Sequence, residues 1–372
     1  MTSLAVDDLL ADPLARRSLG VLSEGQTPSG AFVASPAFDV YDFSWLRDGA
    51  FCAYAIELAG GREQAAAFHR WAAVAVERQR GRAEAVIDAL AAGRTPPPEA
   101  MLPARFTLDG ELERHGPEPW PNFQLDGYGM WLWSLEHHHG TASLPADLAS
   151  AAELVARYLR AAWTMKCWNC WEELDDGEHS LTLTAVAAGL ASAGRLLGRP
   201  EFATDSERVR SRLLSHFVHN GRFIRGRGDR RLDGSLLWLA LPFELLPFDD
   251  PRMRATIEGV RSELIGPGGG VRRYLGDTYY GGGDWILLSC SLGWIDALSG
   301  NRAGFEQARD WVRAQALPNG DLPEQVTMEA QAPEMVEEWE QRWGPVATPL
   351  LWSHAMYLVM MAAGGARWNS SR

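Results

Sequence analysis

Residues 146–163, with the sequence ADLASAAELVARYLRAAW, show the pattern that decides the fold. Apolar side chains recur there every three or four positions, as at Leu148, Val155 and Leu159, which is the period of one face of an α-helix. Residues 181–197 (LTLTAVAAGLASAGRLL) follow the same period and are rich in Ala and Leu. Both stretches predict long helices that pack on two sides.

The same periodicity continues along the chain and predicts about twelve helices. Gly, Pro and Asp occupy the connections between them, and convincing alternating strands are few. Twelve paired helices suggest an all-α fold, a toroid of six helical hairpins or (α/α)6 barrel, whose polar functional residues come from loops at one end. The expected helices cover residues 50–58, 65–76, 83–92, 128–135, 146–163, 181–197, 206–218, 235–245, 253–264, 285–298, 305–317 and 349–361.

The length and composition favour one large domain. No Pro- or Ser-rich linker divides the 372 residues, so we expect a single domain over residues 1–372, with residues 1–40 as an N-terminal lead-in. The apolar fraction of 46% supports a large core. The 16 Trp residues exceed what packing alone demands, and an indole face stacks well on a pyranose ring, although Trp is also an ordinary core residue.

The charge and the first residues limit the partners and the compartment. A net charge of −13 argues against nucleic acid and anionic membranes, which favour basic surfaces, so we expect a small neutral partner. Acidic residues stand near the N-terminus where a secretory signal has a basic and then an apolar region, and no apolar run approaches the ~20 residues of a membrane span. These features predict a cytoplasmic protein; the oligomeric state is not indicated.

Four cysteines fit a reducing compartment. Cys167 and Cys170 form a CxxC motif, but zinc binding would need a second ligand pair and a redox motif would need a βαβ context. We therefore expect buried free thiols and no metal site.

Two glutamate segments, Trp171-Glu172-Glu173 and Leu322-Pro323-Glu324-Gln325, are the candidates for chemistry. A glutamate beside Trp171 should have a raised pKa and suit a general acid, whereas Glu324, in a Gly/Pro loop, is expected to stay ionised as a base. Two carboxyl groups in opposed environments are what hydrolysis of a glycosidic bond requires. Spacing alone leaves open that Glu173 ends a loop and Glu324 caps the next helix.

Five segments in order resemble the glucoamylase family, glycoside hydrolase family 15, whose members are (α/α)6 barrels with an inverting, exo-acting site. Any one segment is weak evidence, but together they span residues 41–354. The segments are YDFSWLRD (41–48), WPNFQLDG (120–127), WEE (171–173), the run from Arg273 to Trp285, and LPEQ (322–325) with PLLWSH (349–354).

The resemblance implies that Glu172 is the general acid, Glu324 the general base and Glu173 a substrate-binding neighbour. Arg47 and Asp48 would hold hydroxyls of the terminal sugar, since a guanidinium donates and a carboxylate accepts, which reads a diol from both sides. Taken alone, the Arg47–Asp48 pair favours an ion pair at a helix N-terminus.

The resemblance also places Tyr41 and Tyr279 beside the catalytic water. Whether Tyr41 acts as a base or only positions the water stays open, although a phenol with a pKa near ~10 is mainly a donor. Ser353 and His354 are neighbours on a helix, point in different directions and are expected to be structural. The remaining substrate-binding residues that the resemblance implies are Trp45, Trp120, Asp126, Arg273 and Trp285, against the alternatives of core aromatics and a solvated loop charge.

The implied activity is inverting, cofactor-free hydrolysis that releases β-glucose from the non-reducing end of short α-gluco-oligosaccharides. The chain is similar to the isomaltose-hydrolysing branch of the family, which implies α-1,6 linkages. No appended starch-binding module is recognisable, which favours a short soluble substrate. The alternatives are trehalase or α-1,4 glucoamylase activity, a phosphorylase or lyase on a similar toroid, and a non-catalytic carbohydrate-binding or regulatory barrel.

Overall fold

The computed structural model describes residues 3–113, 120–140, 142–174 and 177–368, so the remaining residues of the predicted 1–372 domain lie outside the described part. Helices dominate, and each strand has only two residues. The α-helices are α1 (Ser3–Leu10), α2 (Pro13–Glu24), α3 (Leu46–Leu58), α4 (Arg62–Arg78), α5 (Arg80–Ala91), α6 (Asp126–His139), α7 (Ala146–Ala162), α8 (Ser180–Leu197), α9 (Pro200–His216), α10 (Pro251–Gly259), α11 (Ile286–Ser299), α12 (Arg302–Gln315), α13 (Glu334–Trp343) and α14 (Leu351–Trp368). The strands are β1 (Ser44–Trp45), β2 (Arg105–Phe106), β3 (Val218–His219), β4 (Arg222–Phe223), β5 (Val271–Arg272), β6 (Asp284–Trp285) and β7 (Gln325–Val326). Shorter helical turns are η1 (Asp39–Tyr41), η2 (Pro98–Ala100), η3 (Gly234–Leu239), the π-helix η4 (Val260–Leu264) and η5 (Tyr279–Gly281).

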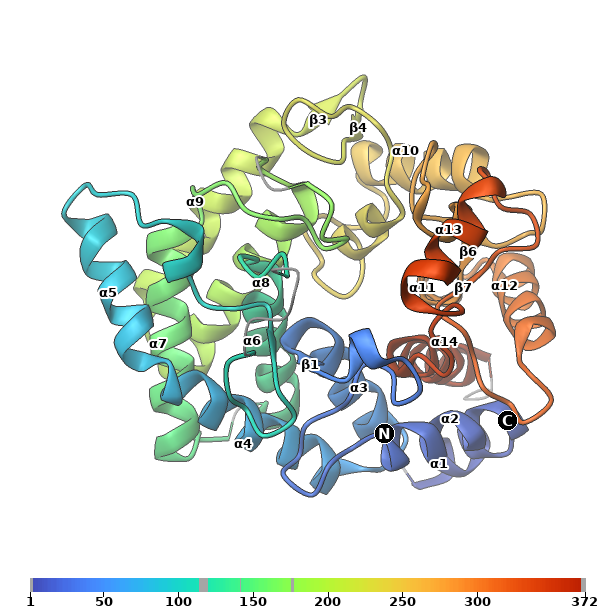
Figure 1. The fold of residues 1–372 in the computed structure, drawn as a ribbon, viewed down its shortest axis with the longest axis horizontal. Helices are drawn as coiled ribbons and strands as arrows, with labels where there is room; N and C mark the ends of the chain where they lie inside the picture. Colours follow the sequence, from blue (N-terminus) through green and yellow to red (C-terminus); the bar gives the residue numbers. More distant parts are fainter. Residues whose placement is uncertain (1–2, 114–119, 141, 175–176, 369–372) are drawn as a thin grey trace.

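Six inner elements close a ring around the centre of the molecule (Figure 1). Each packs against the next in the order α3, α6, α8, η3, α11 and α14, and α14 returns to α3. The outer layer consists of α2, α4, α7, α9, α10 and α12, each packed on an inner element. The fold is therefore the predicted (α/α)6 barrel.

The inner helices α6 and α8 pack closely against their neighbours. Helices α6 and α8 cross closely at two glycines, since a Cβ on Gly189 would lie 2.5 Å from the Cα of Gly129. Among the described helices, α8 is the one long and apolar enough to span a membrane by length and composition, at a mean hydropathy of 1.3. It packs between α6 and α9, and 72% of it is buried, as expected of a core helix.

Most predicted helices are confirmed, but residues 235–245 are an exception. There the inner position is filled by the 3₁₀ turn η3, whose first turn is capped by Asp233 through the amide of Ser235. Pro242 has no N–H to continue a helix, and the chain turns there. The expected helix over 253–264 is α10 followed by the π-helix η4. The lead-in 1–40 contains α1 and α2, and α2 is an outer helix of the ring.

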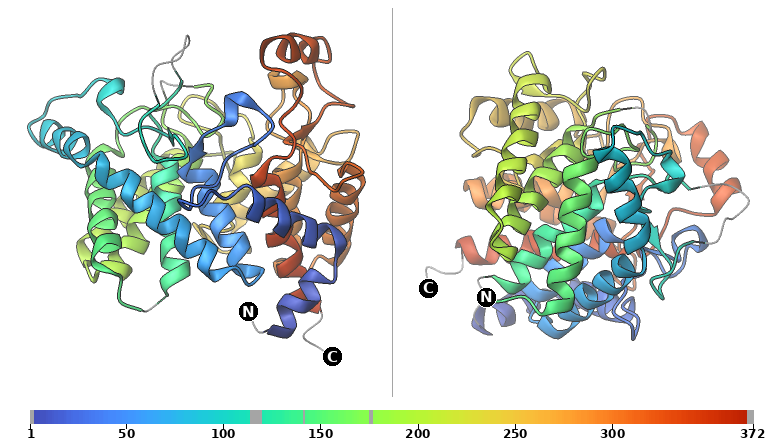
Figure 2. Two further views of the ribbon diagram at one scale, coloured as in Figure 1. Left: turned by 60° about the horizontal axis from the view of Figure 1, so that its bottom comes forward. Right: turned by 90° about the vertical axis from the view of Figure 1, so that its left-hand side faces the viewer.

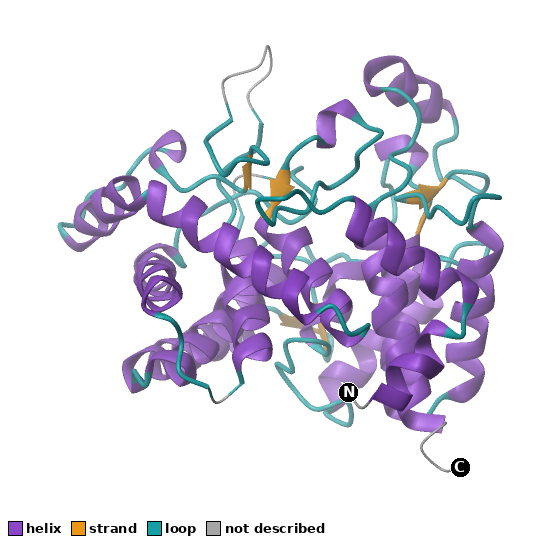
Figure 3. Cartoon of the chain, turned by 90° about the horizontal axis from the view of Figure 1, so that it is seen from below, coloured by secondary structure: helices purple, strands orange, loops and turns teal. Residues whose placement is uncertain are grey.

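The N-terminal ends of the inner elements meet at one end of the barrel, where the long loops gather (Figures 2 and 3). Two small antiparallel sheets stiffen these loops: β1 pairs with β2, and β6 lies between β5 and β7, with Trp285 opposite Gln325. Helix N-termini carry partial positive charge, so this end of the barrel favours carboxylates.

Candidate active site

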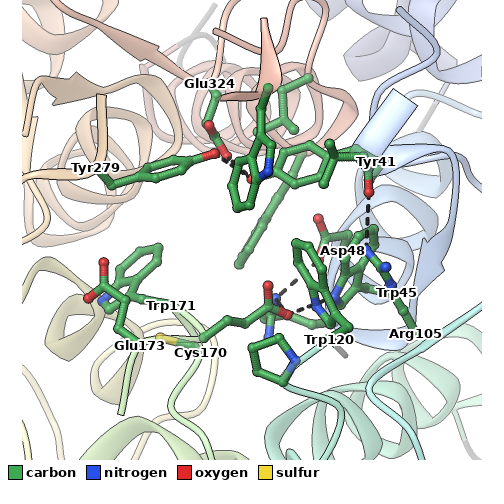
Figure 4. A pocket seen from close by; sticks show the side chains of 18 of the residues that line it. Tyr41, Trp45, Asp48, Arg105, Trp120, Cys170, Trp171, Glu173, Tyr279 and Glu324 are labelled. Carbon is green, nitrogen blue, oxygen red and sulfur yellow. Dashed lines mark hydrogen bonds and ion pairs between the residues drawn. The ribbon is translucent and has the colours of Figure 1, made fainter. Parts of the chain in front are cut away.

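A cavity of about 640 Å³ opens at the loop end of the barrel, within the range of about 300–1,000 Å³ usual for small-molecule sites (Figure 4). Its deeper wall is made of buried side chains such as Trp45 and Trp352, and its mouth of half-buried ones such as Trp120. Eleven of the twelve predicted site residues line it, namely Tyr41, Trp45, Arg47, Asp48, Trp120, Glu172, Glu173, Arg273, Tyr279, Trp285 and Glu324.

The first turn of α3 supplies the charged floor of the cavity. Arg47 is buried and donates to Gln124 (2.7 Å) and Asp126 (3.2 Å), and its Nε lies 3.5 Å from Asp48. Burial raises the pKa of Asp48 to about 7, although the Arg47 charge opposes the shift. Oδ2 of Asp48 is buried, lies 3.5 Å from Arg47 Nε and has no hydrogen-bond partner among the described residues.

Glu172 is presented by a strained loop between α7 and α8. Its φ of 64° is left-handed, a conformation that disfavours residues with a Cβ. Asn169 holds the turn, because its carbonyl and its side-chain oxygen accept the amides of Glu172 and Glu173, each at 3.0 Å. Trp45 Nε1 and Gln124 Nε2 both donate to Oε1 of Glu172 at 2.8 Å, which fixes the carboxyl group against the floor.

Glu173 points away from Glu172 into a cluster of cations. Its Oε1 accepts from Arg273 (2.6 Å), and its Oε2 accepts from Tyr274 (2.6 Å) and Arg225 (3.1 Å). Burial works to raise the pKa of Glu173, but Arg273, Tyr274 and Arg225 outweigh it, and the net shift is downward. Glu173 is therefore held as a carboxylate.

Glu324 lies across the cavity from the segment that carries Cys170 and Glu172 (Figure 4). The Tyr41 hydroxyl donates to its Oε1 at 3.2 Å and is itself hydrogen-bonded to the Tyr279 hydroxyl at 2.8 Å. Oε2 of Glu324 has no partner among the described residues. Burial raises the pKa of Glu324 to about 8, although the Arg273 charge and the two phenols oppose the shift.

Comparison with known proteins identifies the family. The family described as glycosyl hydrolases family 15 matches residues 15–362. The chain belongs to glycoside hydrolase family 15. It is therefore a glycoside hydrolase.

The similarity to known proteins extends over nearly the whole chain. An isomaltose glucohydrolase of Kribbella flavida is 40% identical over 355 residues, which cover 93% of this chain and 91% of that protein. A solved wild-type glycosidase has a TM-score of 0.90 at 39% identity and covers 98% of this chain and 99% of its own. A bacterial glucoamylase complexed with acarbose has a TM-score of 0.74 at 20% identity, covering 96% of this chain and 56% of its own, and supports the barrel fold.

Two sequence-based expectations for this family 15 site need correction. Glu324 was expected to be ionised because it follows a Gly/Pro loop, but the carboxyl group is buried, and burial raises its pKa to about 8. Asp126 does not line the cavity: it is the fully buried first residue of α6 and pairs with Arg47 from behind. Asp126 therefore orients Arg47, and any contact with substrate is indirect.

Ser353 and His354 hold the chain segment that leads to Glu324. Ser353 donates to the carbonyl of Pro323 at 2.8 Å, and His354 Nε2 accepts the amide of Leu322 at 2.9 Å. His354 Nδ1 contacts Ser18 on α2 at 2.9 Å. Both side chains thus anchor the loop of Glu324, which confirms the structural interpretation.

Sequence reasoning missed three residues that organise the family 15 site. Gln124 bridges Arg47 and Glu172, and only its place within the segment 120–127 hinted at this role. Arg225 pairs with Glu173 and Asp233 and lies 3.9 Å from the Tyr274 ring centre, but no motif marks it. Asp233 accepts from Trp171 Nε1 at 3.0 Å, so Arg225 and Asp233 together hold the loop of Glu172 from outside the cavity.

The cysteine prediction is confirmed, since Cys167 and Cys170 are both buried and free. Burial raises the pKa of both thiols, which keeps them protonated. In the part of the chain that the structure describes, no group of three or more His, Cys, Asp or Glu side chains is placed to hold a metal ion.

Proposed function

We propose that this hydrolase removes single glucose units from the non-reducing end of short α-glucosides with inversion at the anomeric carbon. The observation that supports the proposal is that Glu172 and Glu324 line one cavity together with Arg47 and Asp48. Glu324 lies across that cavity from Cys170 and Glu173, the neighbours of Glu172 in the chain (Figure 4). A pair of carboxyl groups on either side of the scissile bond is the arrangement of an inverting glycosidase.

Glu172 suits the general acid because its two oxygens differ. Oε1 accepts hydrogen bonds from Trp45 and Gln124 and lies 3.6 Å from the Arg47 guanidinium. In the proposed mechanism Oε2, the oxygen that neither Trp45 nor Gln124 contacts, delivers the proton to the departing glycosidic oxygen. The rigid turn at Asn169 keeps this donor in place while the bond breaks.

Glu324 suits the general base. Its Oε1 is held by Tyr41, and Oε2 is buried with no partner among the described residues. In the proposed mechanism Oε2 takes the proton from the water that attacks the anomeric carbon. Because Tyr41 donates to Glu324, its role is to position the base and the water. A base whose pKa is raised to about 8 is strong but only partly ionised at neutral pH, so kcat/KM should rise with pH toward 8.

The floor of the cavity favours action from the chain end. Arg47 and Asp48 would bind the hydroxyls of the terminal glucose, and Trp45 and Trp352 would pack against its ring. Buried residues of α3 and α14, such as Arg47 and Trp352, line this part of the cavity. The proposal takes it as the end that holds the terminal glucose and excludes a longer glycone.

We assign the preferred linkage as α-1,6, with isomaltose as the substrate, on the support of the 40% identical isomaltose glucohydrolase. The test is a comparison of kcat/KM for isomaltose, maltose, trehalose and soluble starch, with and without inorganic phosphate. We expect isomaltose to be the best substrate, glucose to be the sole product, and phosphate to make no difference. Starch as the best substrate, or a sugar phosphate product, would overturn the proposal; maltose ahead of isomaltose would overturn the linkage alone.

A further inference from the structure

Helix α13 is not one of the paired helices of the ring and overlies the region of α11, β6 and β7 in Figure 1. Its Trp339 and Trp343 line the cavity. None of its residues is buried, and it packs against η5. Two hydrogen bonds tie it there, from Trp339 Nε1 to the carbonyl of Thr278 (3.0 Å) and from the Tyr280 hydroxyl to the carbonyl of Gly344 (2.7 Å). Its half-buried Trp339 and Trp343 pack against the edge of the core, but the helix has no fully buried residue.

The aromatic face of α13 is part of the cavity wall. Trp339 and Trp343 are four residues apart, which places them on the same side of the helix, and both line the cavity. Their ring centres are 4.8 Å apart, and Trp339 lies 5.0 Å from the ring of Tyr279. The opposite side carries exposed acids such as Glu338. The apolar side of the helix therefore faces the cavity as well as the edge of the core.

A second part of the cavity wall, formed by Trp120 and Arg105, is rigid. The guanidinium of Arg105 is sandwiched between Trp120, 3.8 Å from its ring centre, and Phe43, at 4.0 Å. Arg105 is buried and is held by Glu113, to which its Nε donates at 2.9 Å. This stack fixes the indole of Trp120 over the cavity, because cation–π contacts strengthen when they are desolvated.

These two parts of the cavity wall touch. The ring centres of Trp120 and Trp343 are 6.1 Å apart at an angle of 30°, within the range of about 4.5–7 Å for direct aromatic contact. Two indoles in direct contact leave no space for a sugar ring between them. The pair therefore bridges the mouth of the cavity at this point.

We propose that Trp343 on α13, closed against Trp120, is a specificity-determining residue that limits the substrate to two sugars. In this proposal a third sugar attached to a bound disaccharide would meet the two indoles where they are in contact. The inference rests on the proposed function, because it takes the floor at Arg47 as the site of the terminal glucose. It adds a structural cause for a length preference and assigns that cause to a helix outside the catalytic machinery.

The test compares isomaltose with isomaltotriose and isomaltotetraose in the wild-type enzyme and in Trp343→Ala. We expect the wild type to prefer isomaltose by at least tenfold in kcat/KM, and the ratio of isomaltotriose to isomaltose to rise at least tenfold in the variant. Trp343→Leu, a milder truncation, should move the ratio in the same direction by less. Glu338→Ala, on the exposed side of the same helix, should leave the ratio unchanged.

The outcomes separate this inference from the proposed function. Wild-type enzyme that releases no glucose from isomaltose would overturn the function. Wild-type enzyme that hydrolyses isomaltose and isomaltotriose equally well, or a folded Trp343→Ala variant with an unchanged ratio, would overturn the bridge alone. Because no residue of α13 is buried, we expect both Trp343 variants to melt within a few degrees of the wild type.

Discussion

Replacing the buried base should abolish activity and yet stabilise the protein. Glu324 is fully buried with one oxygen unpartnered among the described residues, and burial raises its pKa to about 8. Ionisation within the cavity is therefore unfavourable. Glu324→Gln keeps the shape and the oxygen that accepts from Tyr41 but can never ionise. The wild type retains a destabilising carboxyl group at this position because catalysis requires it.

The direction and the size of the change in stability follow from proton linkage. The folded protein binds the Glu324 proton more tightly than the unfolded chain, so its favourable contribution is complete below the ordinary pKa of 4.5 and is lost as pH rises toward 8. At about 1.4 kcal/mol per pKa unit, the wild type should lose roughly 1 kcal/mol by pH 5 and roughly 3 kcal/mol by pH 7. With about 2.1 cal/mol/K of unfolding entropy per residue, Glu324→Gln should melt roughly 1 °C higher at pH 5 and roughly 4 °C higher at pH 7.

Glu173→Gln is the matched control, because the two buried glutamates have opposite shifts. Cations hold the pKa of Glu173 below its ordinary value despite burial, so its ionised form stabilises the fold. Glu173→Gln should therefore melt below the wild type at pH 7, and the difference should shrink as the pH falls through the ordinary and then the lowered pKa. Differential scanning calorimetry of the three proteins from pH 3 to pH 8 measures both trends. A Glu324→Gln variant that melts with the wild type at pH 8 would refute the reasoning.

Three further outcomes are expected. Glu172→Gln should lose activity by about 10²–10⁴-fold on isomaltose but recover part of it on α-glucosyl fluoride, whose leaving group needs no proton, whereas Glu324→Gln should not recover; the reverse pattern would exchange the two roles. Tyr41→Phe should lower kcat more than tenfold while destabilising the fold by only about 0.5–1.5 kcal/mol, and unchanged turnover would return Tyr41 to a packing role. The low-pH limb of kcat/KM should lie above the ordinary glutamate pKa, because burial raises the pKa of Glu324; a limb below pH 4 would contradict that cause.

The fold was predictable because helical periodicity is a local signal. Ring closure follows from hairpins whose inner members are apolar on all sides, as in α8 and α11. The segment 235–245 shows the limit, since its apolar spacing fits an α-helix but Pro242 and the cap at Asp233 give η3 instead. Helix α13 was not predicted from the sequence. Its two tryptophans line the cavity, and their spacing repeats over one helical turn only.

The site was predictable where motifs carry it and not where tertiary packing does. Glu172 and Glu324 stand in recognisable segments, and the cavity brings them together. The environment of Glu324 depends on Tyr41 and Tyr279, which are both distant from it in the chain. The burial and the raised pKa of Glu324 therefore have no local signal in the sequence. Arg225 likewise acts through Glu173 from a loop without a motif.

The central claim is that Glu172 and Glu324 act on opposite faces of one anomeric carbon, with water between the base and the sugar. Proton NMR of the first minutes of isomaltose hydrolysis tests this most directly, because the two anomers of free glucose have separate signals before they equilibrate. The account predicts β-glucose as the initial product, with the α-anomer appearing only at the rate of mutarotation. Initial release of α-glucose would contradict it, since retention requires a covalent intermediate and a closer pair of carboxyl groups.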